Sequence, residues 1–254
     1  MERLDGPPVG DPSLAGIARL REKLRLSTPL IAVYDARPSD AFEPLVRAGG
    51  TACCFSYYGR WLAGETLVLE RDHGGCPGAH RALGLEKQYP PYMAHFLTDG
   101  AGAPKGEGLR ASPEIAQAIL DAAHPPEITA DTVLIGPLLL GQWETVKSVT
   151  FFVDPDRLAA VMTLAGYWSA TDVAYAPFGS GCSFLRRALD GGPDERAVVG
   201  ATDIAMRRYL PRDILTLTVG PTHFAKMLTV PEDSFLYRSW WNDLLDVRNR
   251  GRTS

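Results

Sequence analysis

Apolar residues recur along the chain with two different periods, which predicts both helices and strands. From Leu14 to Leu24 they are spaced as on one face of a helix, which Asp11 or Ser13 can cap. Further helices are expected over 51–63, after the Gly/Pro turn at 74–78, over 112–123 and 154–168, and after 220. Strands are predicted by short apolar runs, which cover residues 29–38, 66–70, 131–140, 147–155 and 213–219, with another beginning at 172.

Strands and helices are interleaved in this order, which is typical of an α+β fold, with a mixed α/β fold as the neighbouring class. We expect mixed sheets with packed helices in one compact unit over 1–254. Two similar halves, 14–125 and 126–230, are a further expectation, because each has a strand, a cysteine-bearing Gly/Pro turn and a helix. Residues 231–254 then form a C-terminal helical extension. Its Trp240 and Trp241 can pack on the body or on a second subunit, so a homodimer through this helix is a hypothesis.

Composition and charge narrow the class of protein. The 254 residues are 45% hydrophobic and 22% charged, as in ordinary soluble globular proteins. A formal charge of −4 argues against a general nucleic-acid-binding protein, and no apolar stretch has the length of a membrane helix. The first residues carry acids near Met1 and lack the apolar core of a secretory signal. We therefore expect a cytoplasmic protein that binds neither nucleic acid nor membrane, in which structural disulfides are improbable.

Four cysteines stand out because of the segments that carry them. Cys76 lies in GGCPG, and Cys182 lies in GSGCSF after an apolar run. Glycine permits close backbone approach and proline fixes a turn, and both features accompany cysteine ligands of metal and cluster sites. Cys53 and Cys54 lie in an expected helix, where consecutive side chains diverge by about 100°. At most one of this doublet can therefore face a site shared with Cys76 and Cys182.

These cysteines allow two interpretations. Free cysteine is among the most buried residue types and packs as a small hydrophobic side chain. The spacing also matches no zinc-finger or C-x-x-C pattern. In favour of ligands, two of the four cysteines lie in glycine-rich turns rather than inside helices or strands. The residues by themselves leave buried thiols and metal ligands equally open.

A resemblance to a known family indicates which residues are candidates for the site. It rests on four segments, PLIAVYD, CCFSYYGRWLAGETLVLERDHGGCPGAHRALGL, DVAYAPFGSGCSFLRRAL and VGATDIAMRRYLPRDILTLTVGPTHFAKML. They are similar to the domain-of-unknown-function family 169 and span about residues 14–230. The most specific element is an ordered set: a cysteine before a Gly-Glu strand, Cys-Pro-Gly before ALGL, a Gly-x-Cys loop, and an arginine after a glycine-acid segment. In this sequence those positions are Cys54, Cys76, Cys182 and Arg207.

The cysteine pattern shared with that family suggests a ligand set for an iron–sulfur cluster, and this is the first hypothesis. Cys54, Cys76 and Cys182 would bind a [4Fe–4S] cluster. Cys53, which departs from the pattern, is a candidate for the fourth ligand. Arg207 would balance the negative charge of the cluster or of an anionic substrate. The sequence indicates neither which reaction the protein would catalyse nor which redox partner it would have.

Two other functions stay open. The first is a cofactor-free binding module, in which backbone N–H groups near Gly179 and Gly181 and the guanidinium of Arg207 bind a small anion. The second is a zinc site or a thiol-dependent enzyme, in which His73 or His80 assists a cysteine. Zinc is less favoured than the cluster.

Overall fold

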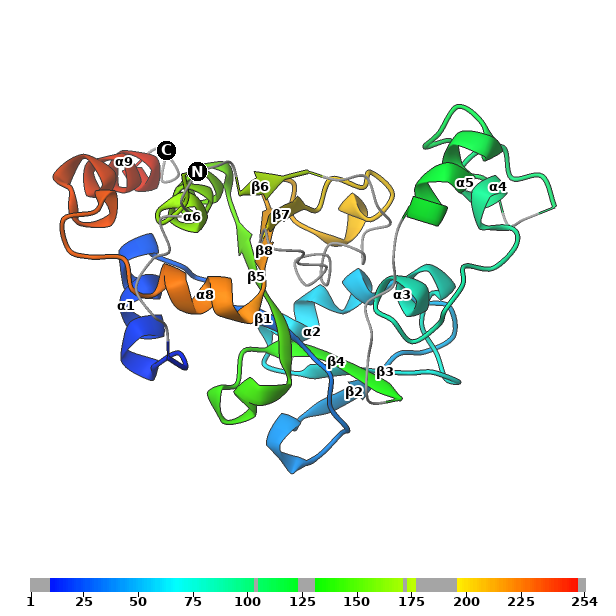
Figure 1. The fold of residues 1–254 in the computed structure, drawn as a ribbon, viewed down its shortest axis with the longest axis horizontal. Helices are drawn as coiled ribbons and strands as arrows, with labels where there is room; N and C mark the ends of the chain where they lie inside the picture. The colour runs from blue at the N-terminus through cyan, green and yellow to red at the C-terminus, as the bar shows by residue number, and fades with distance from the viewer. Residues whose placement is uncertain (1–9, 103–104, 123–130, 171–172, 177–195, 251–254) are drawn as a thin grey trace.

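The computed structural model describes residues 10–102, 105–122, 131–170, 173–176 and 196–250. Residues 249 and 250 are described by their backbone alone. The fold is α+β, as predicted, with helices packed against one mixed sheet (Figure 1). The strands of the sheet are β1 (Ile31–Tyr34), β2 (Leu45–Arg47), β3 (Thr66–Glu70), β4 (Thr132–Pro137), β5 (Val146–Val153), β6 (Ala174–Tyr175), β7 (Ala197–Gly200) and β8 (Leu215–Val219). They lie side by side in the order β2-β3-β4-β1-β5-β8-β7-β6.

This strand order is a twofold repeat. The first four strands are ordered β2-β3-β4-β1 and the last four β6-β7-β8-β5, and β1 and β5 pair antiparallel at the centre. Both edges carry a parallel pair, β2 with β3 and β6 with β7, whereas the other neighbours are antiparallel. The division between the halves falls between β4 and β5, so the segment 132–137, which the sequence places in the expected half 126–230, pairs within the first half.

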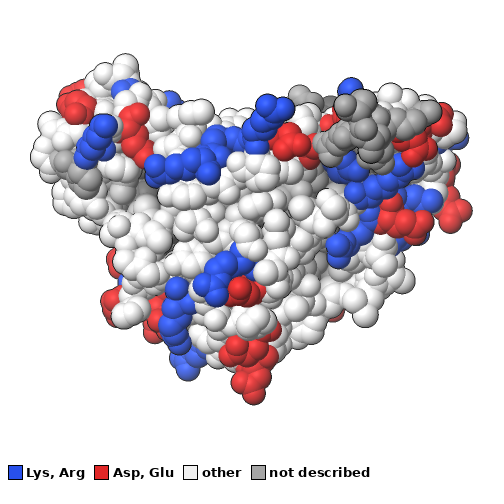
Figure 2. Space-filling view, turned by 180° about the vertical axis from the view of Figure 1, so that it is seen from behind, with Lys and Arg blue, Asp and Glu red and all other residues white. Residues whose placement is uncertain are grey.

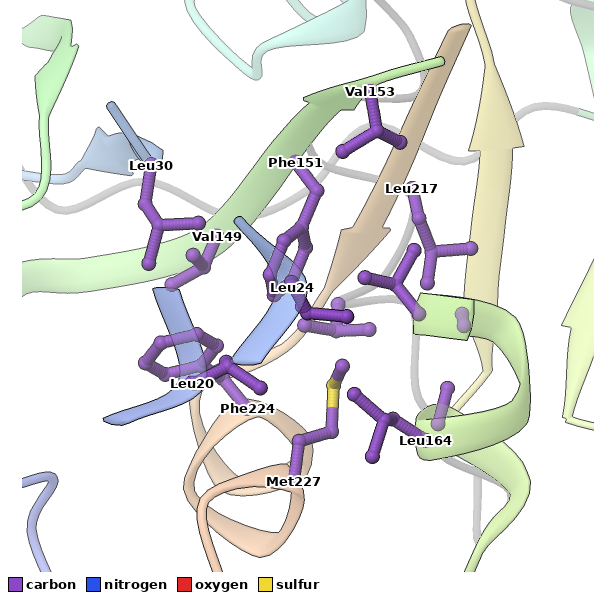
Figure 3. Packing of buried hydrophobic residues seen from close by; sticks show 14 of the residues in the cluster. Leu20, Leu24, Leu30, Val149, Phe151, Val153, Leu164, Leu217, Phe224 and Met227 are labelled. Atoms are coloured by element: carbon purple, nitrogen blue, oxygen red, sulfur yellow. The ribbon is translucent and has the colours of Figure 1, made fainter. Parts of the chain in front are cut away.

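Four helices cover one face of the sheet. They are α1 (Leu14–Leu24), α6 (Pro155–Gly166), α8 (Pro221–Met227) and α9 (Ser239–Arg250). Two of these helices begin as their sequences predict: the Ser13 hydroxyl accepts the Gly16 N–H in α1, and Asp154 accepts the Arg157 N–H in α6. Side chains of α1, α6 and α8 meet those of β5 and β8 in the larger apolar core (Figure 3). The C-terminal extension packs on this side as well, because Trp241 is buried and its Nε1–H donates to the Lys23 carbonyl at 2.9 Å.

Shorter elements cover the opposite face. They are the 3₁₀ helix η2 (Cys54–Tyr57), α2 (Tyr58–Leu62), α3 (Pro77–Ala82) and the connection between β7 and β8, which contains the 3₁₀ helix η4 (Arg207–Tyr209). Alternate residues of the strands face this side, among them Ile31, Val33 and Phe152, and they build a second apolar core with the shorter elements. The remaining 3₁₀ helices are η1 (Asp40–Phe42), η3 (Leu140–Thr145) and η5 (Phe235–Tyr237).

A small helical lobe projects beyond α3. It consists of α4 (Met93–Phe96) and α5 (Pro113–Ala122), which share an apolar cluster of their own (Figure 1). The loop between the two helices returns to the lobe, since the Glu107 N–H donates to the Phe96 carbonyl at 2.7 Å. This loop carries Glu107 to the face that holds the cysteine-bearing turns.

Two parts of the sequence-based assignment were wrong. The helix expected over 51–63 is shorter and divided into η2 and α2, because Cys53 keeps an extended backbone with φ −65° and ψ 134°. Residues 45–47, which lie in none of the strands expected from the sequence, form the edge strand β2, which depends on its pairing with β3. A strand of three residues has too little local pattern to be recognised without its partner.

None of the described helices is long and apolar enough to cross a membrane. Figure 2 shows the molecule from behind, with separate groups of basic and acidic side chains spread over the face and uncharged surface between them. No basic area extends across that whole face.

Candidate thiol site

The cysteine doublet follows β2 and precedes α2, and its two side chains have different surroundings. Cys54 is 1% exposed and packs in the apolar core on the α2 side of the sheet. Cys53 is half-buried at the margin of the same core, and its carbonyl accepts the Ser56 N–H at 2.9 Å as η2 begins. The two thiols therefore differ in burial, and Cys53 is the more accessible one.

The second cysteine-bearing turn follows β3 and requires its two glycines. Gly74 has φ +62°, and a Cβ there would lie 1.9 Å from the Ala48 carbonyl oxygen. Gly75 has φ +92°, and its Cβ would lie 2.9 Å from the Leu69 side chain. Cys76 then caps α3, with Pro77 at the first helical position as expected. The turn thus fixes the half-buried Cys76 thiol in one direction.

Several influences act on that thiol. Burial raises the pKa of Cys76 most, and the nearby backbone N–H groups of Ala79 and Gly78 lower it in part. Negative charges on Cys53 and Glu107 raise the pKa further. Cys76 is therefore a protonated thiol at neutral pH, with Cys53 and Glu107 near enough for their charges to reach it.

Glu107, which acts on Cys76, is itself influenced by another carboxylate, a guanidinium and Cys53. Burial raises the pKa of Glu107 most, Asp203 raises it further, Arg208 lowers it, and Cys53 raises it. Asp203 and Arg208 come from the connection between β7 and β8, and Arg208 also lies 4.9 Å from the Tyr209 ring centroid. We call this group the thiol–carboxylate cluster; its members are Cys53, Cys76, Glu107, Asp203 and Arg208.

Arg207, the arginine named from the family pattern, makes its contacts within its own loop. Its guanidinium donates to the carbonyls of Arg212 at 2.6 Å, Pro211 at 3.2 Å and Ala201 at 3.5 Å, and to that of Ile214. These bonds hold the connection between β7 and β8 in shape. Anion binding by Arg207 stays a prediction, and the guanidinium that acts on the cluster is that of Arg208.

The other predicted residues lie elsewhere. Cys182, Gly179 and Gly181 are outside the described residues. His80 is buried, and its Nε2 lies 2.6 Å from the Gly74 carbonyl oxygen, so that nitrogen donates to the turn. His73 is exposed. Within the described ranges, no three His, Cys, Asp or Glu side chains converge closely enough to hold a metal ion.

An open pocket of about 440 Å³ lies beside the Cys76 turn. Both turn glycines, Pro77 and His80 line it, together with polar residues of 71–73 and 86–90. Cys76 itself does not, so the turn separates this pocket from the thiol.

Glu107, Asp203 and Arg208 were missed in the sequence. Glu107 lies in the run GEG, and only the flanking glycines mark it. The groups that raise its pKa, Cys53 and Asp203, are distant in the chain. No spacing in the sequence predicts such a meeting.

Comparison with family models matches residues 19–230 to a family described as uncharacterised ArCR. No curated protein and no solved structure matches the chain.

Proposed function

The chain belongs to the domain-of-unknown-function family 169, and from that premise we propose that it binds an iron–sulfur cluster through thiols on the α2 side of the sheet. The observation that carries the proposal is that Cys53 and Cys76, 23 positions apart by their numbers, pack at the margin of the same apolar core, where the charge of Cys53 raises the pKa of Cys76. The turn around Cys76 also offers backbone N–H groups to the sulfur, as cluster sulfurs require. The donor set of thiols with apolar neighbours fits such a group.

The proposed ligand of the doublet is Cys53 rather than Cys54. Cys54 is enclosed by apolar side chains, whereas Cys53 is half-buried and acts on Cys76. This exchanges the roles that we assigned from the sequence, in which Cys54 was the ligand and Cys53 the candidate for a fourth.

Cys182 enters the proposal through the twofold strand order. It lies in the connection between the parallel strands β6 and β7, and the doublet lies in the connection between the parallel strands β2 and β3. The two positions therefore correspond in the twofold strand order, which is why we include Cys182 as the third proposed ligand.

A cluster held by three thiolates supplies an open iron, which suits Lewis-acid chemistry or electron transfer. Side chains near the proposed cluster would release or hold protons and balance its negative charge. Cys76 must lose its proton to become a ligand, so metal binding should release protons. Glu107, whose pKa is raised, can hold a proton beside Cys53, and Arg208 balances negative charge.

The test is iron and sulfide content with a visible spectrum, on protein purified and reconstituted without oxygen. Cys53→Ser, Cys76→Ser and Cys182→Ser should each lose most of the iron. Cys54→Ser is the matched control, one residue from Cys53, and should keep it. Iron-free, colourless wild-type protein overturns the proposal, as does equal loss in Cys53→Ser and Cys54→Ser. Zinc at one per chain without iron would favour the zinc interpretation instead.

Location and assembly are part of the same proposal. A cytoplasmic location fits because reducing conditions keep thiols available as ligands. We also propose a homodimer through α9, whose Trp240 is 57% exposed.

A further inference from the structure

The open pocket of about 440 Å³ beside the Cys76 turn has no role in the iron–sulfur proposal, because Cys76 does not line it. Its lining comes from the turn after β3, from α3 and from the connection between α3 and α4. Ligand sites in proteins have volumes of about 300–1,000 Å³, so this pocket has room for a small molecule.

Arg71 provides the pocket with a guanidinium that the protein holds in place. Its Nη1–H donates to the Leu85 carbonyl at 2.5 Å, and its Nε–H donates to the Asp131 carboxylate at 3.3 Å. The remaining N–H groups of Arg71 have no acceptor among the described residues. A guanidinium fixed in this way is suited to a carboxylate, which can accept two of its N–H groups at once.

The turn adds a backbone donor to the same pocket. Gly75 is buried and lines the pocket, and its N–H donates to no described residue. Buried backbone N–H groups in native proteins are almost always paired, so an unpaired one beside a pocket favours a bound acceptor. Arg71 and Gly75 together therefore favour an anionic group on the ligand.

Two carboxylates also line the pocket. Asp72 and Glu86 are exposed, and the side chain of neither is paired with a described residue. A purely anionic ligand would lie near these two negative charges, and a purely cationic ligand would lie near the Arg71 guanidinium. A molecule with one charge of each sign complements both kinds of lining group.

The rest of the lining includes apolar surface, which Tyr89, Pro77 and Pro90 supply. The guanidinium of Arg81, a residue of α3 that is 7% exposed, lies 5.1 Å from the centroid of the Tyr89 ring. This contact holds the ring against α3. An apolar side chain of a ligand can pack on this ring and on the two prolines.

We propose that this pocket binds an α-amino acid with an apolar side chain. The carboxylate of the ligand accepts from Arg71 and from the Gly75 N–H. Its ammonium group lies near Asp72 and Glu86, and its side chain packs against Tyr89. An amino acid is the smallest common ligand that carries all three of these groups.

The first test compares probes that share a phenyl ring, on metal-free protein at neutral pH, by isothermal titration calorimetry. L-phenylalanine carries both charges, 3-phenylpropionate lacks the ammonium group and phenethylamine lacks the carboxylate. L-phenylalanine should bind, and each of the other two should bind about tenfold more weakly, because a charge-assisted contact is lost. L-leucine is a second amino acid with an apolar side chain. Absence of binding by both amino acids overturns the proposal, as does equal or tighter binding of 3-phenylpropionate or phenethylamine.

The second test concerns the ammonium contact. Asp72→Asn and Glu86→Gln each remove one negative charge and no contact with a described residue, so urea unfolding should be unchanged. Each variant should bind L-phenylalanine about threefold more weakly, and the double variant about tenfold, whereas binding of 3-phenylpropionate should not weaken. Unchanged affinity of the double variant for L-phenylalanine overturns the proposal.

Glu232→Gln is the matched control for that test. Glu232 is an exposed carboxylate after α8 that does not line the pocket. Its removal changes the net charge by the same amount and should leave the affinity for L-phenylalanine unchanged. An equal loss in Glu232→Gln and Glu86→Gln would show that net charge, and not this pocket, sets the affinity, and would overturn the proposal.

These tests are independent of the iron–sulfur proposal. They use metal-free protein, and the substituted residues include no proposed cysteine ligand. The iron content of Glu86→Gln after reconstitution should equal that of the wild type, whether or not L-phenylalanine binds.

Discussion

Burial and the negative charges of Cys53 and Glu107 all raise the pKa of the Cys76 thiol. Glu107→Gln removes one of these charges, so we expect the pKa of the Cys76 thiol to fall relative to that of the wild type. In metal-free protein, alkylation of Cys76 by iodoacetamide should then begin at a lower pH. Mass spectrometry of the peptide that contains Cys76 measures this for each pH.

Glu114→Gln is the control for that experiment. Glu114 is an exposed carboxylate of α5, and the groups that act on it, Ser112, His95 and Asp99, belong to the helical lobe. Its removal should leave the alkylation profile unchanged. An equal shift in both variants would mean that net charge, and not the position of Glu107, sets the effect.

Glu107 also predicts how stability depends on pH. Its pKa is raised in the folded protein, so the stability it contributes is present below the ordinary pKa of glutamate and is lost as pH rises through the folded value. Glu107→Gln stays neutral at every pH. Its gain in free energy of unfolding over the wild type should therefore grow from acidic to neutral pH, as measured by urea unfolding. A gain that does not change with pH contradicts a raised pKa.

For single residues, the sequence predicted the kinds of side chain at the site better than the directions in which those side chains point. The tight turn at Cys76 followed from GGCPG. Which thiol of the doublet faces Cys76 depends on the extended backbone of Cys53, and that conformation has no marker in the residue itself.

Among the elements, the turn between β3 and α3 is held by backbone contacts that exclude a side chain. Gly75→Ala would place a Cβ 2.9 Å from Leu69 and 3.0 Å from the His80 Nε2, at a φ of +92°. We expect a loss of at least about 1–2 kcal/mol in the free energy of unfolding. Urea unfolding measures it, and the alkylation rate of Cys76 should rise as the turn loosens.

Gly59→Ala is the matched control within α2. Nothing lies within 4 Å of a Cβ at Gly59, and its φ is not positive. Alanine in a helix is favoured over glycine, so this variant should be more stable by about 0.5–1 kcal/mol. If both variants lose stability equally, the conformation of the Cys76 turn is not the cause.

For the molecule as a whole, the fold class was predictable and the strand order was not. Long runs such as TLVLE and KSVTFFV are strands by their own pattern. A strand was expected to begin at 172, where the two-residue β6 lies, but the three-residue edge strand β2 is defined only by its pairing across the sheet. The cluster that brings Glu107, Asp203 and Arg208 to the thiols depends on those pairings, so it could not be read from local sequence.

The last prediction for the whole molecule concerns dimerisation through α9. Variants of the two adjacent tryptophans of this helix should distinguish its contribution to stability from its contribution to association. Trp241 is 2% exposed and bonded to Lys23, so Trp241→Ala should cost about 3–5 kcal/mol of stability. Trp240 is mostly exposed and stacks on Phe235 at 6.2 Å, so Trp240→Ala should cost only about 0.5–1.5 kcal/mol. If α9 forms the proposed dimer, light scattering should show the Trp240→Ala protein as a monomer at concentrations where the wild type is dimeric. A wild type that stays monomeric, or a variant that dimerises equally well, leaves Trp240 as an ordinary exposed side chain.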